Sequence, residues 1–310
     1  MKRAGVLLLG AAPLIAAGVY FVVPGDSADP AGAPAAAASS SAATGSARAD
    51  AKDRAEDKRE EAEREADDAL IADLPPGLAA PAKKELAEQL VSSAENSTTD
   101  WRTAYGTIED LGDGDGYTAG IIGFCTGTHD LLTLVERYTE GHPDNGLAAY
   151  LPALREVDGS DSHEGLDPGF TAAWRAEAEV PAFRAAQEEE RDRVYFEPAV
   201  RLAKLDGLGT LGQFVYYDAM VFHGPDTDAE GFYGLRERAM REAGTPGQGG
   251  SEKAYLSAFL DIRKQAMEAK RPGIDTSRVD TAQRRFLTAG NMKLATPLVW
   301  EMYGDTYRVP

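Results

Sequence analysis

Residues 105–124 read YGTIEDLGDGDGYTAGIIGF, and their composition differs from that of the sequence on both sides. Glycines recur every few residues, and β-branched or aromatic residues lie between them. This pattern is typical of short strands that are joined by tight turns. We therefore predict a small antiparallel sheet in this stretch.

Apolar residues before and after the predicted sheet repeat at helical spacing, which indicates amphipathic helices. The three clearest stripes are Leu86, Leu90, Val91 and Ala94; Leu131, Leu132, Leu134, Val135 and Tyr138; and Tyr255, Leu256, Phe259, Ile262 and Ala266. No repeat of 20 to 50 residues is visible, which disfavours a solenoid. The sequence predicts one mainly α (α+β) domain over residues 78–310.

The first 77 residues divide into three segments that precede this domain. Residues 1–23 combine a basic start with an uncharged apolar run, as in a signal peptide or an uncleaved signal anchor. Residues 24–48 are an Ala/Ser/Gly/Pro linker that we expect to be disordered. Residues 49–77 form a densely charged helical or disordered arm that ends at Pro75-Pro76-Gly77. We expect a secreted protein, or one anchored on the extracellular face of the membrane.

Composition limits the function classes. The chain has 310 residues, 43% of them hydrophobic and 27% charged, which is typical of a soluble globular protein. Its 32 Lys and Arg residues against 51 Asp and Glu residues give a net charge of −19. Such a surface repels nucleic-acid phosphates and suits a polycationic partner, although it also serves simply to keep an exported protein soluble.

Common nucleophile, cofactor and metal signatures are missing from the sequence. The single cysteine, Cys125, follows an apolar run and is expected to be a buried, inert thiol. The four histidines lack metal-ligand spacing, and neither a G-x-S-x-G nor a P-loop motif occurs. Residues 113–124 open like an EF-hand loop but have Thr118 and Phe124 where Gly and Glu are required. We expect no metal and no cofactor.

Two carboxylates in contrasting contexts remain. Glu95 ends the first predicted helix, where partial burial would favour its protonated form, whereas Asp113 lies in a glycine-rich turn that would keep it ionised. Glycoside hydrolysis requires one acid and one base of this kind. The alternative, a solvated helix-end Glu and an Asx-turn Asp, stays open on the residues alone, because 51 acidic residues always offer some suitable pair.

The sequence from about residue 78 to the C-terminus resembles the actinobacterial chitosanases of glycoside hydrolase family 46. The blocks that carry the resemblance are LVSSAENS (90–97), IEDLGDGDGYTAGIIGFC (108–125), YLPAL (150–154), EERDRVYF (189–196), LGQFVYYD (211–218), TSRVD (276–280) and YGD (303–305). The resemblance implies a two-lobed, lysozyme-like helical fold with the substrate in the cleft between the lobes. It also implies endo-acting hydrolysis of β-1,4 bonds between glucosamine units of chitosan, with inversion at the anomeric carbon.

By this resemblance, Glu95 is the general acid, Asp113 is the general base, and Thr118 positions the attacking water. Inversion requires roughly 6.5 to 9.5 Å between the carboxylates so that a water fits between them. A charged network that holds the acid in place is implied for Asp218, Arg263 and Arg278. The resemblance further implies that Asp130 binds a glucosamine ammonium group and that three other residues contact substrate in the cleft: Ser97, Thr128 and Asp305.

Four positions depart from the family pattern and affect substrate subsites: Thr107, Asp115, Lys270 and Gly273. Asp115 replaces a usual Arg, and its negative charge close to Asp113 is expected to favour protonation of the base and to shift activity towards higher pH.

Two other functions compete with the chitosanase hypothesis. A non-catalytic protein that binds polycationic glycan would fit the net charge, and a muramidase-like enzyme that acts on cell-wall glycan would fit the fold class. We expect a monomer whose partner is chitosan or glucosamine oligosaccharides, with no nucleic acid and with membrane contact only through a possible N-terminal anchor.

Overall fold

The structure is a computed structural model that describes residues 58–59 and 61–310. The predicted signal segment, the linker, and residues 49–57 and 60 of the charged arm lie outside the described residues. Within the arm, residues 61–72 are helical, and the helix has ended before Pro75-Pro76-Gly77. In the part of the chain that is described, no helix combines the length and apolar character that a membrane span requires.

Helices dominate the fold, as predicted. The α-helices are α2 (Pro81–Glu95), α3 (Asp130–Gly141), α4 (Leu151–Val157), α5 (Phe170–Glu177), α6 (Pro181–Arg191), α7 (Glu197–Leu205), α8 (Thr210–His223), α9 (Phe232–Glu242), α10 (Glu252–Lys270) and α11 (Arg284–Thr288). Two segments are π-helical, η5 (Asp192–Phe196) and η7 (Arg278–Gln283). Short 3₁₀ turns are η1 (Gly77–Ala79), η2 (Trp101–Ala104), η3 (Thr126–Thr128), η4 (Ala148–Tyr150) and η6 (Pro246–Gln248). The three predicted amphipathic helices are confirmed as α2, α3 and α10.

Helix α2 shows how the local sequence determines the position of Glu95. Pro81 starts the helix, where its missing N–H costs nothing. Leu90 and Val91 are buried on its inner face. At the other end, Asn96 leaves helical geometry with φ −125°, and its N–H donates to the carbonyl of Ser92. Glu95 is therefore the last helical residue.

The predicted sheet is confirmed and has the strand order β1-β2-β3. Its strands are β1 (Ile108–Asp110), β2 (Tyr117–Ala119) and β3 (Phe124–Cys125), all antiparallel. Between β1 and β2, Gly112, Gly114 and Gly116 have positive φ, which a turn this tight requires. A second sheet, the hairpin of β4 (Leu298–Met302) and β5 (Asp305–Val309), was not predicted.

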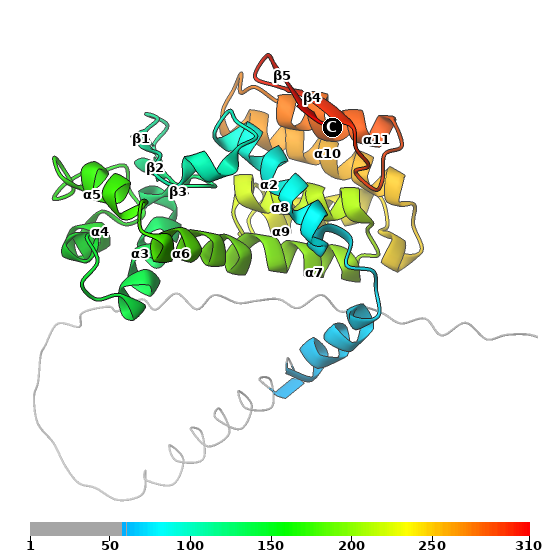
Figure 1. Cartoon of the computed structure of the whole chain (residues 1–310). Helices are drawn as coiled ribbons and strands as arrows, with labels where there is room; N and C mark the ends of the chain where they lie inside the picture. Colours follow the sequence, from blue (N-terminus) through cyan, green and yellow to red (C-terminus); the bar gives the residue numbers. More distant parts are fainter. Residues whose placement is uncertain (1–57, 60) are drawn as a thin grey trace, which may run out of the picture. The chain divides into compact units, whose positions relative to one another are not determined.

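The elements form two lobes (Figure 1). One lobe holds the sheet β1–β3 with α3, α4 and α5, and the other holds α8 to α11 with the β4–β5 hairpin. The run of α6, η5 and α7 extends from one lobe to the other, and α2 lies above it (Figure 1). Lysozyme-like proteins have two lobes of this kind, so the predicted fold class is confirmed.

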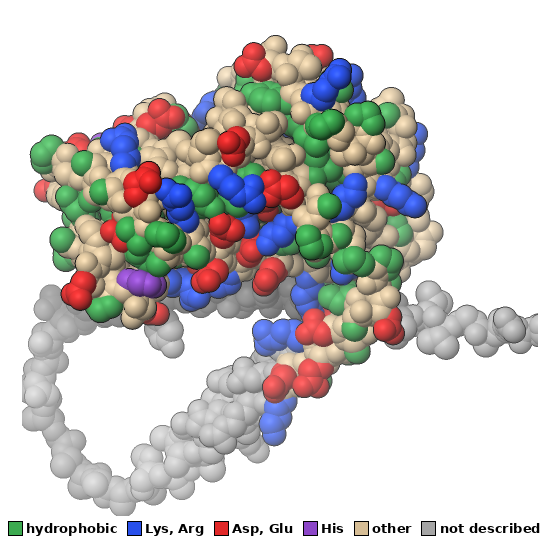
Figure 2. Space-filling view, viewed as in Figure 1, with side chains coloured by type: hydrophobic (Ala, Val, Ile, Leu, Met, Phe, Trp, Pro, Cys, Tyr) green, Lys and Arg blue, Asp and Glu red, His purple; other side chains and the backbone are tan. Residues whose placement is uncertain are grey.

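Aromatic pairs pack within each lobe, in a hydrophobic core that is continuous between the lobes. In the first, Trp174 and Phe183 meet edge to face with ring centroids 5.0 Å apart. In the second, Tyr216 and Phe232 do the same at 5.1 Å. Since all four side chains are essentially inaccessible to solvent, each lobe is well packed. Charged side chains of both signs are interspersed on the molecular face in Figure 2.

Candidate active site

Glu95 lies at the C-terminus of α2 with 21% of its side chain exposed. Its Oε1 accepts a hydrogen bond from Nη2 of Arg278, the first residue of η7. The Arg278 side chain is only 2% exposed. The carboxylate is therefore held from the protein side by a buried cation.

Asp218, Arg263 and Arg278 form a single buried network. The Nε of Arg278 contacts both carboxylate oxygens of Asp218 at 3.0 Å, and Nη1 of Arg263 donates to Asp218 Oδ2 at 2.7 Å. Gln283, which the sequence analysis missed, donates to the same oxygen at 2.6 Å. Although burial alone would raise the pKa of Asp218, the two guanidinium groups lower it below its usual value. The structure thus brings Asp218, Arg263 and Arg278, the three predicted network residues, together behind Glu95.

Thr118 lies on the central strand β2, opposite Cys125 on β3. Its hydroxyl is 3.3 Å from the Cys125 sulfur. Gly123, which has φ +74°, separates Thr118 from Glu95: a Cβ at this position would lie 3.1 Å from Thr118 Cγ2 and 3.8 Å from Glu95 Oε2. Thr118 and Glu95 therefore border the same small space, which the glycine leaves open.

Cys125 is half-buried rather than fully buried. Desolvation, together with the charge of Asp130, raises the pKa of its thiol to about 12. A thiol with so high a pKa is almost entirely protonated at neutral pH, as expected for an inert cysteine.

Asp113 lies in the turn between β1 and β2 and is 16% exposed. Its Oδ1 accepts from the backbone N–H of Asp115 at 3.3 Å. Its Oδ2 accepts from Nη2 of Arg271 at 3.0 Å. Sequence reasoning missed Arg271, because an arginine directly after a long helix carries no local signal of a partner far away in the chain.

Asp130 is the first residue of α3 and accepts three hydrogen bonds within the protein. Cys125 N and Thr128 Oγ1 donate to Oδ1 at 2.8 and 2.9 Å, and Tyr195 donates its hydroxyl to Oδ2 at 2.7 Å. Desolvation raises the pKa of Asp130 to about 6, and the hydrogen bond from Tyr195 opposes that rise. The contribution of Tyr195, from the π-helical segment η5, was not predicted.

The other predicted contact residues lie at exposed positions. Ser97 follows α2 with φ 51°, and Asp305 begins β5. In the described part of the chain, neither side chain is hydrogen-bonded to Glu95, Asp113 or Asp130. Among the departures from the family pattern, Thr107 donates its hydroxyl to the Ala104 carbonyl at 2.7 Å, and Lys270 is exposed at the end of α10.

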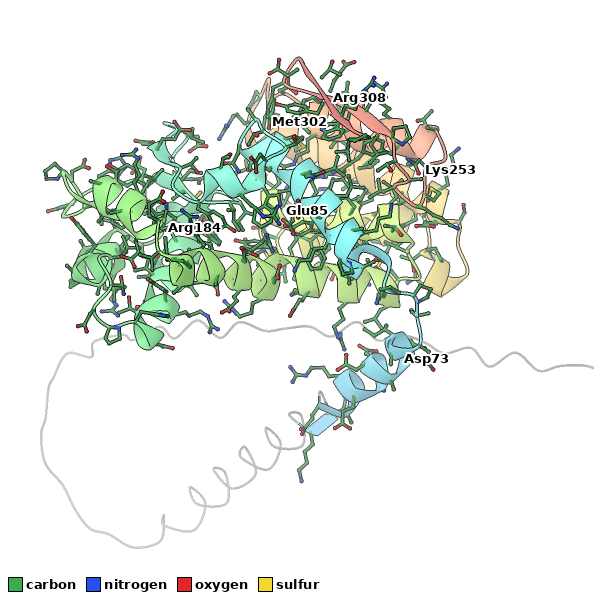
Figure 3. All side chains as sticks on the ribbon, viewed as in Figure 1. Asp73, Glu85, Arg184, Lys253, Met302 and Arg308 are labelled. Atoms are coloured by element: carbon green, nitrogen blue, oxygen red, sulfur yellow. The ribbon has the colours of Figure 1, made fainter. Side chains whose placement is uncertain are left out.

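The β4–β5 hairpin approaches the same region of the structure. Met302, which is labelled at the end of β4 in Figure 3, accepts a hydrogen bond through sulfur from Ser277 at 3.5 Å. Ser277 also accepts from the backbone N–H of Tyr303 at 3.0 Å. Because Ser277 directly precedes Arg278, the hairpin supports the start of η7 and with it the arginine that contacts Glu95.

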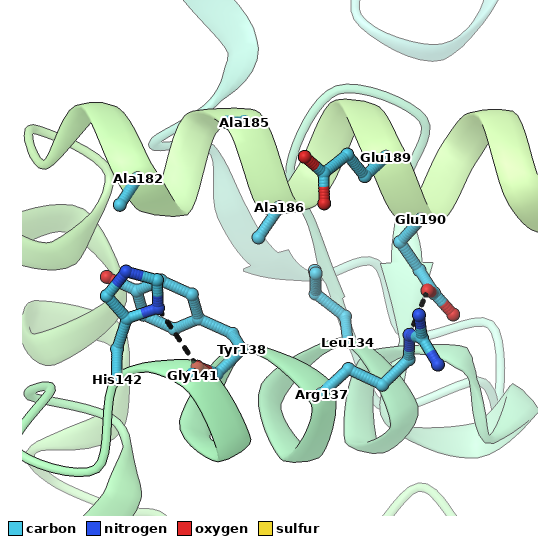
Figure 4. A pocket seen from close by; sticks show the side chains of 10 residues that line it. All are labelled: Leu134, Arg137, Tyr138, Gly141, His142, Ala182, Ala185, Ala186, Glu189 and Glu190. Atoms are coloured by element: carbon cyan, nitrogen blue, oxygen red, sulfur yellow. Dashed lines mark hydrogen bonds and ion pairs between the residues drawn. The ribbon is translucent and has the colours of Figure 1, made fainter.

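A cavity of about 320 Å³ lies away from these residues, between α3 and α6 (Figure 4). It is bordered by the ion pair of Arg137 with Glu190, 3.1 Å apart, and by His142, whose ring stacks on Tyr138. None of the predicted site residues lines it, so this cavity is separate from the candidate active site. Across residues 58–59 and 61–310, no group of three His, Cys, Asp or Glu side chains is arranged to hold a metal ion.

Comparison with known families gives a match over most of the domain. The profile described as glycosyl hydrolase family 46 matches residues 89–298. This range contains Glu95, Asp113, Thr118 and the three residues of the buried charge network.

Individual relatives agree with the family match. The chitosanase of Streptomyces sp. (strain N174) is 59% identical over 231 residues, which cover 74% of this chain and 83% of the relative. The chitosanase of Nocardioides sp. (strain N106) is 54% identical over 233 residues, covering 75% and 84%. The co-crystal structure of chitosanase OU01 with substrate superimposes with a TM-score of 0.74 at 52% identity, covering 76% of this chain and 99% of that one.

Proposed function

Because the chain belongs to glycosyl hydrolase family 46 and is therefore a glycoside hydrolase, we propose that it cleaves β-1,4 bonds between glucosamine units within chitosan chains. The relatives named above are chitosanases, and one of them binds substrate in the crystal. The observation that carries the proposal is the arrangement of Glu95, with Oε1 bound to Arg278 and Oε2 directed towards the space that Gly123 leaves open.

In the proposed mechanism, Glu95 is the general acid. Its proton passes to the glycosidic oxygen as the bond between that oxygen and the anomeric carbon breaks. The buried guanidinium of Arg278 fixes one carboxyl oxygen, so the other can be aimed at the leaving group.

Asp113 is proposed as the general base. It accepts a proton from a water molecule while the oxygen of that water attacks the anomeric carbon from the face opposite the leaving group, which inverts the configuration. Thr118 offers its hydroxyl from the central strand of the same sheet, where it can orient this water. A turn and a helix end on different elements allow the room that an inverting reaction needs.

Substrate charge supports the choice of chitosan. At neutral pH, an ionised Asp130 in the first turn of α3 suits a glucosamine ammonium group. The net charge of −19 raises the local concentration of a polycation near the enzyme. We propose that Ser97, Thr128 and Asp305 add contacts along the cleft.

The decisive test follows new reducing ends from highly deacetylated chitosan. Wild type should release them, Glu95→Gln should lower the rate by at least about 100-fold, and the exposed control Glu140→Gln should leave it unchanged. Binding without turnover by wild type would favour the non-catalytic binder, and activity only on peptidoglycan would favour the muramidase-like enzyme.

Analysis of the products tests the proposed inversion of configuration and the proposed endo action. Initial α-anomers by proton NMR support inversion through Asp113, whereas initial β-anomers would refute it. A rapid fall in viscosity at low extents of hydrolysis supports endo action.

We propose that residues 78–310 form the catalytic domain and act as a monomer, and that residues 1–23 direct export. Activity of a chain that begins at residue 78 tests the domain bounds, light scattering of the purified protein tests the oligomeric state, and immunodetection in the medium or on the cell surface tests export.

A further inference from the structure

The turn that carries Asp113 is unusually acidic. Residues 109–116 read EDLGDGDG, with Glu109, Asp110, Asp113 and Asp115 and without a Lys or Arg. Within the turn, the backbone N–H of Asp115 donates to Asp113 Oδ1 at 3.3 Å, which holds one oxygen of the Asp113 carboxylate. The other oxygen, Oδ2, accepts a hydrogen bond from a cation in another part of the fold.

Arg271 supplies that cation from the other lobe. Its Nη2 lies 3.0 Å from Asp113 Oδ2, and the two side chains are 51% and 16% exposed. Within the described part of the chain, no other ion pair or side-chain hydrogen bond joins residues 108–125 to residues 252–310. The contact therefore links the sheet turn directly to the lobe that holds α10.

Local sequence places Arg271 at a helix end. Its N–H still donates to the Met267 carbonyl, but its backbone is extended, with φ −143° and ψ 98°. Pro272 follows, and proline cannot continue a helix. The arginine side chain can therefore reach away from α10 towards the turn.

Two arginines come from helix α10 and from the residue directly after it. Arg263, which is fully buried, belongs to the Asp218 network behind Glu95. Arg271, about two helical turns further along, contacts Asp113. Neighbouring parts of the chain therefore carry one arginine of the network behind Glu95 and one arginine that contacts Asp113.

We propose that Arg271 is a positioning residue for Asp113: its ion pair with Oδ2 orients the base carboxylate and places a positive charge against it. The inference rests on the proposed function, because it assigns Asp113 the role of base. Its physical basis is the ion pair itself, since an opposite charge at this distance favours the ionised carboxylate.

Other charged groups near Asp113 do not provide this function. His163 is directed at Asp110, with Nε2 3.6 Å from Oδ2, rather than at Asp113. Arg278 is bound to Glu95 and Asp218 in the buried network. Glu109 and Asp110 add further negative charge on the side of β1. Among the residues that the structure describes, Arg271 is the one whose positive charge contacts the Asp113 carboxylate.

The test measures kcat/KM of the full chain against pH with a glucosamine hexamer as substrate. In Arg271→Gln, the acidic limb should move to higher pH by about 0.5 to 1 unit, because the base is then protonated more readily. Arg271→Lys should restore the limb, since the observed contact uses a single nitrogen that an ammonium can replace.

Arg155→Gln is the matched control, because Arg155 is 55% exposed and forms a 2.8 Å ion pair with Glu136 on the surface. It should leave the pH profile unchanged, and thermal unfolding should be the same in all variants because exposed pairs add little stability. An acidic limb that stays in place in Arg271→Gln, or that Arg271→Lys fails to restore, would overturn the inference. A wild type without activity on the hexamer would instead refute the proposed function, so the two failures are distinct.

Discussion

The guanidinium of Arg278 is hydrogen-bonded to the carboxylate of Glu95 although the arginine side chain is only 2% exposed. Its Nε also contacts both oxygens of Asp218 at 3.0 Å. Because a buried guanidinium is costly unless it is paired, the two carboxylates share one cation and stabilise its position. The orientation of the proposed acid therefore depends on side chains that are almost fully buried.

Asp218→Asn should be strongly destabilising. It removes the charge that compensates two buried arginines, Arg263 and Arg278, and losing one partner of a buried ion pair typically costs about 3 to 5 kcal/mol. Urea unfolding at neutral pH measures the loss. Asp261→Asn is the control, because its pair with Arg284 is largely exposed and should contribute less than about 1 kcal/mol. Equal losses in the two variants would contradict the prediction.

Gly123→Ala should lower activity more than stability. The new Cβ would crowd Thr118 and approach Glu95, closing the space that the two side chains share. Its positive φ adds a backbone cost of about 1 to 2 kcal/mol. Gly290→Ala separates the two effects, because Gly290 has φ +68° but no neighbour within 4 Å of its Cβ position. We expect similar shifts in the unfolding midpoint for both variants and a loss of kcat in Gly123→Ala alone. Full kcat in that variant would show that the space is not used.

Substrate binding should weaken as the pH falls through about 6. The pKa of Asp130 is raised to about 6 by desolvation, so the carboxylate that we propose as the ammonium ligand exists mainly above that pH. Tyr195→Phe removes a hydrogen bond that stabilises the ionised form. The rise in KM on acidification should therefore begin at a higher pH in Tyr195→Phe than in wild type. An unchanged KM profile would argue against Asp130 as an ammonium ligand.

The sequence was sufficient to predict the elements that carry Glu95, Thr118 and Asp113. Helical periodicity located α2 and α3, and glycine spacing located the sheet, because both patterns are local. The buried position of Arg263 and Arg278 was accessible only through the family resemblance, since arginine has no preference for a core site.

Long-range partners were beyond sequence reasoning. Arg271 and Asp113 are 158 residues apart, and Tyr195 reaches Asp130 from a π-helical segment that has no sequence signature. The β4–β5 hairpin was missed because its strands, LVWEM and DTYRV, are short and the turn between them lacks an Asn-Gly or Asp-Gly pair. These features depend on tertiary packing rather than on local pattern.

The environment of Glu88, which lies outside the proposed active site, leads us to expect that the free energy of unfolding depends on pH. It lies on α2 with its side chain 5% exposed, 3.2 Å from Arg191, and it accepts a hydrogen bond from Tyr217 at 3.0 Å. Desolvation raises its pKa from 4.5 to about 7 despite the arginine. Since the folded state then binds more protons than the unfolded state, the free energy of unfolding should fall as the pH rises from about 4.5 to 7.

Glu88→Gln tests this linkage, because the amide stays neutral at every pH and Arg191 keeps Asp192 as a partner at 2.9 Å. Relative to Glu88→Gln, wild type should lose about 2 to 4 kcal/mol between pH 4.5 and 7, as a shift of this size implies. Urea unfolding across that range gives the difference directly. The exposed control Glu140→Gln should follow wild type at each pH. Parallel profiles for wild type and Glu88→Gln would mean that Glu88 is ionised in the folded protein throughout, with Arg191 compensating its burial in full.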